Sequence, residues 1–343
     1  SIIDHLSKRG ANNNMAALKM TISCFLFLQV IYCLLSSFAP TNVQGLKVGF
    51  YDKACPKAEL IVKKSVFEAV KNDRTIAAPL LRMFFHDCFV RGCEGSVLLE
   101  LKNKKDEKNS IPNLTLRGFE IIDNVKAALE KECPGIVSCS DVLALVARDA
   151  MVALNGPSWE VETGRRDGLV TNITEALLNL PSPFNNISSL ITQFQSKGLD
   201  KKDLVVLSGG HTIGNGHCPQ ITNRLYNFTG KGDSDPNLDT EYAVKLRGKC
   251  KPTDTTTALE MDPGSFKTFD ESYFKLVSQR RGLFQSDAAL LDNQETKSYV
   301  LKSLNSDGST FFKDFGVSMV KMGRIGVLTG QVGEVRKKCR MVN

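Results

Sequence analysis

The sequence predicts a mainly α-helical fold. Apolar residues recur close to the helical period in three segments, 59–71, 116–130 and 140–154, whereas strand-like alternation is scarce. Turn signals are spread evenly between the helical stretches, without a repeat or a low-complexity linker. With 42% hydrophobic and 24% charged residues among 343, the composition suits a folded globular chain and excludes a disordered, fibrous or multi-span membrane protein.

An apolar run near the N-terminus predicts a secretory signal peptide. The run covers residues 21–35, follows Lys19 and precedes the small residues SSFA. It is shorter than the ~20 residues that span a bilayer, and Gln29 interrupts it, so a cleaved signal is favoured over a signal anchor. Cleavage is expected between residues 39 and 45, either after Ala39 or just before Gln44.

These signals divide the chain into three parts. Because the chain begins with Ser1, residues 1–14 are interpreted as translated upstream sequence. Residues 15–43 are assigned to the signal peptide. Residues 44–343 are assigned to a single domain, although the segment LPSPFNN, 180–186, breaks the helical pattern with two prolines and could separate two helical halves.

The cysteine count points to an oxidising compartment. Ten cysteines in 343 residues are unusual for a reduced cytosolic protein. Residues 1–43 hold two of them, with three basic residues and one acidic residue, so the remaining chain has eight cysteines and a net charge of +5. Eight cysteines in a secreted chain predict four disulfides. The mild, scattered charge does not support a nucleic-acid-binding protein.

The segment LLRMFFHDCFVRGCEGS, 80–96, is the densest in chemically active residues. On a helix, Arg82 and His86 lie on one face, with Phe85 beside them. A histidine transfers protons near neutral pH, and a fixed guanidinium stabilises negative charge that develops during bond cleavage. A partly buried histidine paired with a carboxylate is a second interpretation. A third is a zinc site of His86, Cys88 and Cys93, although a short disulfide is more natural in a secreted chain.

The segment DLVVLSGGHTIGNGHCP, 203–219, offers a second candidate site. The missing side chains of Gly209 and Gly210 would let a planar cofactor approach His211. The alternative is a helix that ends in a glycine cap, beside an incidental histidine.

The segment MDPGSFKTFDESYF, 261–274, offers a third. Asp262, Ser265 and Asp270 place hard oxygens around a turn, a set that calcium prefers. An Asx turn with a helix N-cap explains the same residues without a metal.

Taken together, the motifs carry a family resemblance. Their order is HDCFVRGC, LRGFEIIDNVK, VSCSDVLALVARD, GPSWEVETGRRDG, LSGGHTIG and, after the last cysteine, RMVN. This series, from about Gly45 to Asn343, resembles the secreted haem peroxidases of plants, the class III family. The resemblance implies the plant-peroxidase-type helical fold, with haem held between a distal and a proximal helical half and with four disulfides.

The resemblance also implies a role for each matching residue around haem b. His211 would be the axial ligand of the iron, and Asp287 would accept its other ring N–H. His86 would be the catalytic base that takes a proton from hydrogen peroxide and returns it to the leaving oxygen. Arg82 would stabilise the charge that develops in the transition state.

Four further residues would complete this pocket. Asn113, with Glu107 behind it, would hold His86 in the basic tautomer. Phe85 would line the distal side, and Pro181 would lie at the exposed haem edge where phenolic donors bind.

Asn113 also begins the glycosylation sequon NLT. Its amide cannot easily serve both purposes, so we expect Asn113 to be unmodified. Asn172, Asn186 and Asn227 begin sequons without this conflict and are candidates for glycans.

The resemblance also implies four disulfides and the ligands of two calcium sites. The implied disulfides join Cys55 with Cys133, Cys88 with Cys93, Cys139 with Cys339, and Cys218 with Cys250. The distal calcium ion would bind the side chains of Asp87, Glu94 and Ser96 and the carbonyls of Val90 and Gly92. The proximal ion would bind Thr212, Asp262, Ser265, Thr268 and Asp270. Glu94 stands where the family usually has aspartate and Ser265 where threonine is frequent, so binding is expected to persist, with altered affinity at Glu94.

These features predict an enzyme that uses hydrogen peroxide to oxidise small phenolic donors. A monomer secreted to the extracellular space or cell wall is expected, without nucleic-acid partners and without membrane attachment after signal cleavage. The alternative is a secreted, disulfide-linked haem- or metal-binding protein without peroxidase turnover. Arg82, His86 and Asn113 together favour the enzyme, because a storage or transport protein does not need an acid–base and charge-stabilising set.

Overall fold

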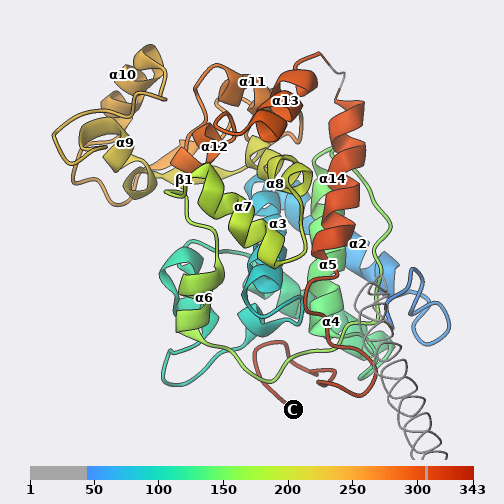
Figure 1. The fold of residues 1–343 in the computed structure, drawn as a ribbon. Coiled ribbons are helices and arrows are strands. Elements are labelled where there is room, and N and C mark those ends of the chain that lie inside the picture. The colour runs from blue at the N-terminus through green and yellow to red at the C-terminus, as the bar shows by residue number, and fades with distance from the viewer. Residues whose placement is uncertain (1–44, 306–307) are drawn as a thin grey trace, which may run out of the picture. The chain divides into compact units, whose positions relative to one another are not determined.

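Helices make up nearly all the regular structure of the part of the chain that a computed structural model describes, residues 45–305 and 308–343 (Figure 1). The α-helices are α2 (Ala58–Asn72), α3 (Ala77–Val90), α4 (Phe119–Glu132), α5 (Cys139–Ala153), α6 (Ile173–Asn179), α7 (Ile187–Ser196), α8 (Lys201–Ser208), α9 (Thr222–Tyr226), α10 (Thr240–Lys249), α11 (Ser272–Ser278), α12 (Gln285–Ala289), α13 (Gln294–Ser303) and α14 (Ser309–Met322). The mainly α prediction is confirmed. The predicted signal peptide, 15–43, and residues 1–14 lie outside the described residues.

Short 3-10 helices and one small sheet connect these helices. The 3-10 helices are η1 (Arg74–Ile76), η2 (Ser96–Leu98), η3 (Glu107–Asn109), η4 (Ile111–Asn113), η5 (Gly209–Thr212) and η6 (Cys218–Gln220). Strands β1 (Asn215–His217) and β2 (Ala258–Glu260) pair antiparallel, with Gly216 opposite Leu259.

The three helices predicted from periodicity are present as α2, α4 and α5. Two begin and end within two residues of the predicted bounds, but α4 begins at Phe119 instead of residue 116. Gly118 precedes it with a φ of 94°, in the left-handed region that favours glycine. A Cβ there would also come within 2.8 Å of Leu80 Cδ2, so close packing on α3 adds to the conformational requirement.

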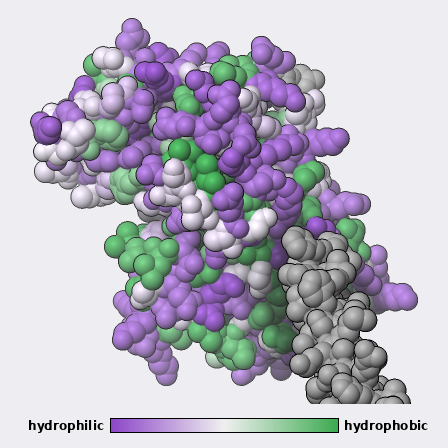
Figure 2. All heavy atoms as spheres, viewed as in Figure 1, coloured by the Kyte–Doolittle hydropathy of each residue, from purple (hydrophilic) through white to green (hydrophobic). Residues whose placement is uncertain are grey.

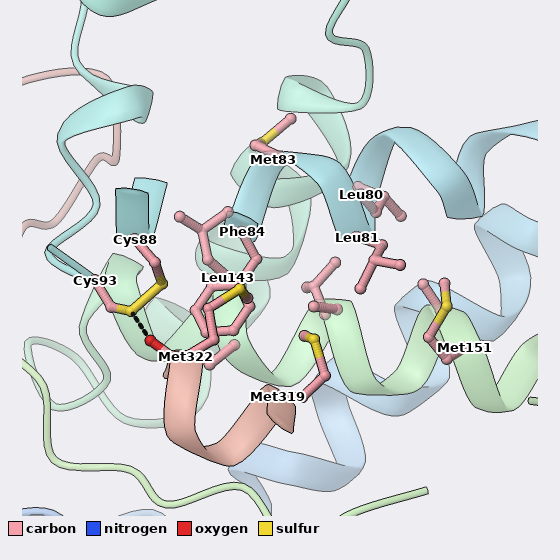
Figure 3. Close-up of a cluster of buried hydrophobic side chains, with 14 of the residues drawn as sticks. Leu80, Leu81, Met83, Phe84, Cys88, Cys93, Leu143, Met151, Met319 and Met322 are labelled. Carbon is pink, nitrogen blue, oxygen red and sulfur yellow. Dashed lines mark hydrogen bonds between the residues drawn. A yellow bond between two sulfur atoms is a disulfide. The ribbon is translucent and has the colours of Figure 1, made fainter. Parts of the chain in front are cut away.

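The main core forms where α5 packs against both α2 and α3. Every residue of α5 from Cys139 to Ala147 is buried, as expected for a helix that is apolar nearly all round. The side chain of Ser138 caps its start by accepting the backbone N–H of Asp141 at 3.1 Å. Figure 3 shows the packing around α3, in which Leu81 and Phe84 point toward Leu143 and Met151 of α5 and Met319 and Met322 of α14, whereas Met83 points to the opposite side of α3.

A second, smaller cluster is built by the segment between β1 and α12. It contains the buried side chains of Cys218, Ile221, Leu225, Leu238, Ala243, Leu246, Cys250, Leu259, Met261, Leu283 and Phe284. Helices α9 and α10 of this segment lie at the upper left of Figure 1. The proline-containing segment 180–186 lies between α6 and α7, within one compact unit, Gly45–Asn343.

Four disulfides connect the same pairs that the resemblance implies: Cys55 with Cys133, Cys88 with Cys93, Cys139 with Cys339, and Cys218 with Cys250. The third links the start of α5 to the C-terminal segment across 200 residues of sequence.

Within residues 45–305 and 308–343, no helix is both long and apolar enough to cross a membrane.

Candidate active site

Helix α3 brings Arg82 and His86 together one turn apart. Nε of Arg82 donates a hydrogen bond to Nε2 of His86 at 3.1 Å. The same guanidinium is held from outside the helix, because Nη1 donates to Oγ1 of Thr115 at 2.8 Å and Nη2 to the carbonyl of Pro112 at 2.6 Å. The cation is therefore fixed beside the imidazole by η4 and the loop that follows it.

The hydrogen bonds of Asn113 determine which nitrogen of His86 carries the proton. Nδ2 of Asn113 donates to the backbone carbonyl of Glu107 at 2.7 Å, so Oδ1 faces Nδ1 of His86 and accepts its N–H. The proton of the neutral ring is then on Nδ1, and Nε2 is a free base. The bond from Arg82 to Nε2 requires the same tautomer, so two independent contacts agree.

The electrostatic environment keeps His86 neutral. The side chain is only 4% exposed, and burial together with the charge of Arg82 lowers the pKa of His86 well below its usual range, although the Asn113 bond acts in the opposite direction. Burial lowers the pKa of Arg82 to about 10, so the guanidinium stays charged at neutral pH. The ring of Phe85 lies edge-on to His86, with centroids 5.5 Å apart. A neutral base beside a fixed cation can accept a proton and stabilise a developing anion.

His211 lies in η5, directly after α8, and pairs with a buried carboxylate. Its Nδ1 is 2.7 Å from Oδ1 of Asp287 at the start of α12. Asp287 also accepts the hydroxyl of Tyr273 at 2.9 Å and the backbone N–H of Phe284 at 2.8 Å. Burial alone would raise the pKa of Asp287, but the His211 interaction and these hydrogen bonds outweigh burial and lower it. The carboxylate therefore stays ionised and holds the imidazole proton on Nδ1.

This arrangement fits a haem-iron ligand. With Nδ1 bonded to Asp287, Nε2 of His211 keeps its lone pair, and the side chain is 39% exposed. Beside it, a Cβ added at Gly210 would find no atom closer than Leu81 Cδ2 at 3.6 Å. Since Leu81 precedes Arg82, the proximal and distal segments lie next to each other.

One expectation at this segment is corrected. We expected the missing side chains of both Gly209 and Gly210 to admit a cofactor, but a Cβ at Gly209 would come within 2.6 Å of Phe311. That glycine makes room for the protein's own core. The alternative of a glycine cap holds in part: α8 ends with Gly209 as its C-cap, but Gly209 has a φ of −59°, outside the left-handed region, and the chain continues into η5.

The zinc alternative for the distal segment is excluded by covalent structure. Cys88 and Cys93 form a disulfide, so neither offers a thiolate to a metal beside His86. The alternative of a histidine paired with a carboxylate does not describe His86, whose partners are Asn113 and Arg82.

The residues expected around a distal calcium ion gather in the loop after α3. Asp87 is fully buried and accepts the backbone N–H groups of Gly95 at 2.8 Å and Val97 at 3.3 Å. Among the described residues, Oγ of Ser96 and both carboxylate oxygens of Glu107 are buried without a partner in good hydrogen-bond geometry, although Ser96 is near enough to Glu107 to lower the pKa of its carboxyl. Burial raises the pKa of Asp87 to about 7, and burial with the charge of Asp87 raises that of Glu107 to about 8. A hard cation such as calcium would give these unpaired oxygens a partner and would offset the repulsion between the two carboxylates.

The other distal residues have additional partners. The carbonyl of Val90 accepts Nζ of Lys197 at 3.3 Å, and that of Gly92 accepts the N–H of Glu94 at 2.8 Å. The carboxylate of Glu94 forms an ion pair with Nε of Arg91 at 3.1 Å.

The residues expected around a proximal calcium ion are connected by hydrogen bonds. Thr212 Oγ1 lies 3.1 Å from Oδ1 of Asp270 and 3.4 Å from Oδ2 of Asp262. Ser265 donates its hydroxyl to Asp270 at 2.6 Å, and Thr268 bonds through its backbone N–H to the carbonyl of Ser265 at 2.7 Å. Burial and the charge of Asp270 raise the pKa of Asp262 to about 6. Asp270 also accepts the N–H of Ser272 at 2.9 Å, the expected Asx-turn contact, whereas the expected N-cap is absent: the residue before α11 is Glu271, whose side chain makes no capping hydrogen bond.

The four sequons differ sharply in environment. Asn113 is 2% exposed with both amide atoms engaged. The amide oxygens of Asn172 and Asn186 cap α6 and α7, and that of Asn227 accepts the N–H of Gly232 at 2.9 Å. In these three the bond engages the amide oxygen and not the nitrogen that a glycan would modify. Pro181 lies half-buried between α6 and α7.

Two residues near the catalytic side chains were not predicted from the sequence. Tyr273 donates its hydroxyl to Asp287. His217 on β1 lies close enough to Arg82 that burial and the charge of Arg82 lower the pKa of His217. Both residues stand inside quoted motifs, but only the fold brings them to the site. With His86 and His211, His217 completes the histidines of the described chain.

Comparison with known proteins gives a consistent result. A family model described as peroxidase matches residues 62–306. The chain is 71% identical over 329 residues to Peroxidase 27 of Arabidopsis thaliana, covering 96% of this chain and 100% of the relative. It is 55% identical over 302 residues to Peroxidase 1 of the same plant, covering 88% and 93%, and 52% identical over 323 residues to Peroxidase 1 of Oryza sativa subsp. japonica, covering 92% and 99%.

Proposed function

Because this chain belongs to the class III family of plant peroxidases and is an enzyme that uses hydrogen peroxide, we propose that His86 and Arg82 carry out the cleavage of the O–O bond and that His211 holds the haem iron. The hydrogen-bond network that leaves Nε2 of His86 unprotonated carries this assignment. Haem b, when bound, supplies an iron centre that takes up the oxidising equivalents of the peroxide and returns them to donors one electron at a time.

His86 moves one proton between the two oxygens of the peroxide. Nε2 accepts the proton from the oxygen that is to remain and delivers it to the oxygen that departs, so that the leaving group is water and not hydroxide. Asn113 keeps the second ring proton on Nδ1 throughout and acts as a positioning residue. The guanidinium of Arg82 stabilises the negative charge on the departing oxygen.

His211 and Asp287 form the proximal side. The ionised Asp287 accepts the Nδ1 proton of His211, which increases the basicity of Nε2 toward iron. Tyr273 and the backbone of Phe284 share the same carboxylate and keep it oriented.

Small phenols are the proposed donors, approaching near Phe85 and Pro181. Apolar side chains are exposed close to the loop that holds Arg82, with Ile111 75% and Leu114 65% exposed. Helix α6 contacts η4, which carries Ile111. Figure 2 shows hydrophobic residues gathered on the surface over α6. An apolar rim suits an aromatic ring whose hydroxyl is to be oxidised.

Two calcium ions are proposed to stabilise the two halves. The distal ion would use Asp87, Ser96 and Glu94 with the carbonyls of Val90 and Gly92, and its best support is the buried, unpartnered oxygen of Ser96. The proximal ion would use Thr212, Asp262, Ser265, Thr268 and Asp270.

The processing of the chain follows from its secretion. We assign 15–43 to a signal peptide and 44–343 to the peroxidase domain. The product is a monomer in the extracellular space or cell wall, with glycans on Asn172, Asn186 and Asn227.

A spectrum and a peroxide reaction test the whole assignment. The purified protein should show a Soret band that changes when hydrogen peroxide is added. His86→Leu should keep the band and lose about 100- to 10,000-fold in the rate of the peroxide reaction. A protein without haem, or an unchanged rate in His86→Leu, would overturn the proposal.

A further inference from the structure

The carboxylate of Glu94 is engaged by a cation of the protein itself. Its Oε1 lies 3.1 Å from Nε of Arg91, and Nη1 of Arg91 lies 2.6 Å from Oε2 of Glu175 on α6. The Glu94 side chain is only 8% exposed, so the first contact is largely shielded from water. These three residues form an ion-pair chain that runs from the loop after α3 to α6.

The length of the glutamate side chain makes this contact possible. Its carboxylate fills the space above Gly168, where an added Cβ would lie 2.2 Å from Oε2. The backbone keeps the position, because the N–H of Gly168 donates to the carbonyl of Glu94 at 2.8 Å. An aspartate would end one methylene earlier, further from Arg91.

Buried oxygens lie in the two short helices that follow this loop, Ser96 in η2 and Glu107 in η3. Among the described residues, Ser96 Oγ and both carboxylate oxygens of Glu107 have no partner in good hydrogen-bond geometry, and Ser96 is only near enough to lower the pKa of Glu107. Asp87 adds a carboxylate that accepts only backbone N–H groups. Calcium needs six to eight oxygens, so a cation bound here would draw on Glu94 as well.

We propose that Arg91 competes with calcium for the carboxylate of Glu94, so that the ion-pair chain Glu94–Arg91–Glu175 weakens the distal calcium site. The inference rests on the calcium part of the proposed function. Two cations near one carboxylate repel each other, and the carboxylate must leave Arg91, wholly or in part, to ligate the metal. Glu175 makes this costlier, because it holds Arg91 in place from the other side.

A double-mutant cycle tests the competition. Calcium-depleted holoenzyme is titrated with calcium chloride by calorimetry for the wild type, Arg91→Gln, Glu94→Gln and the double variant. Arg91→Gln should tighten the distal site by up to about fivefold, the upper limit expected for release of a partly exposed ion pair. In the Glu94→Gln background the same change should have a clearly smaller effect, because the contested carboxylate is gone and only the repulsion between Arg91 and the ion remains. The proximal site serves as an internal reference.

A matched control separates competition from general charge. Arg324→Gln removes another arginine from an ion pair, with Glu162 at 2.6 Å, and should leave both calcium affinities unchanged. Equal tightening by Arg91→Gln in both Glu94 backgrounds would mean that Arg91 acts only through its charge. No tightening, or weaker binding, would mean that Arg91 orients Glu94 for the metal, and either result overturns the proposal.

If the calcium part of the proposed function is wrong, the results differ from those expected when only the competition by Arg91 is wrong. If no variant binds a distal calcium ion while the Soret band and the peroxide reaction are intact, the calcium assignment and this inference are both wrong, and the catalytic assignment stands.

Discussion

Replacing Asn113 with valine should slow the reaction with hydrogen peroxide and move its pH dependence. Valine has a similar size but removes both amide contacts, the acceptor for Nδ1 of His86 and the donor to the carbonyl of Glu107 at 2.7 Å. The contacts of Arg82 to Thr115 and Pro112 do not involve the Asn113 side chain and should remain. The variant therefore isolates the orientation of the base.

Two contributions set the size of the effect. One net hydrogen bond contributes about 0.5–1.5 kcal/mol, which alone would reduce the population of the competent tautomer roughly 2- to 13-fold. The substitution also leaves the Glu107 carbonyl unpaired and frees the His86 ring to leave its orientation. Loss of such a supporting partner typically lowers activity about 10- to 100-fold. We expect the second-order rate constant for peroxide to fall by about 10- to 100-fold.

The pH profile separates this role from a merely structural one. Burial and the charge of Arg82 lower the pKa of His86, and the Asn113 bond raises it. Only the unprotonated ring accepts a proton, so the rate is present above this pKa and is lost as the pH falls through it. Removing the contribution that raises the pKa should move the acid limb to lower pH.

Stopped-flow absorption of the Soret band after mixing with peroxide, repeated across pH, measures both quantities. Asn109→Val is the control, since the amide of Asn109 donates to Asp106 and not to any group that contacts His86. An Asn113→Val enzyme with the wild-type rate and acid limb would refute the reasoning.

Three further predictions follow from other parts of the molecule. Asp287→Asn should raise the reduction potential of the bound haem, because His211 loses a negatively charged acceptor, and spectroelectrochemistry measures this; an unchanged potential would contradict the pairing. Mass spectrometry of glycopeptides from active protein should find Asn113 unmodified, since its nitrogen is a buried donor, and substantial occupancy would exclude its role beside His86. Replacing Cys139 and Cys339 with serine should lower the free energy of unfolding by about 5 kcal/mol in denaturant titrations, against about 2 kcal/mol for the Cys88–Cys93 pair, because the first closes a far longer loop; equal losses would rule out this loop-entropy account.

Local pattern was sufficient to predict the helices and the chemistry of single residues. The apolar periods at α2 and α5 predicted both helices, because a helix must bury one continuous face. The spacing of Arg82 and His86 correctly indicated one helix face, since residues four apart are neighbours whatever the fold. The motif order was specific enough to identify the family.

Contacts across long sequence distances were not accessible to the same reasoning. Asp287 is 76 residues from His211, and Asn113 is 27 from His86. Their roles were expected only by resemblance, and no spacing rule could have found Tyr273 as the second partner of Asp287. Gly209 shows how local reasoning failed, because the atom that needs its space belongs to Phe311, about a hundred residues away in the chain.

The sequence by itself determined the helical class, the acid–base and charge-stabilising residue types, and the family. Helical periodicity and residue chemistry act over a few positions, so they can be read without the fold. Only the tertiary structure decided that Asn113 donates to Glu107 and thereby leaves Nε2 of His86 basic. It also decided that Glu94 is held by Arg91, because the direction of a hydrogen bond and the competition for a carboxylate depend on which backbone and side-chain groups the fold brings within about 3 Å.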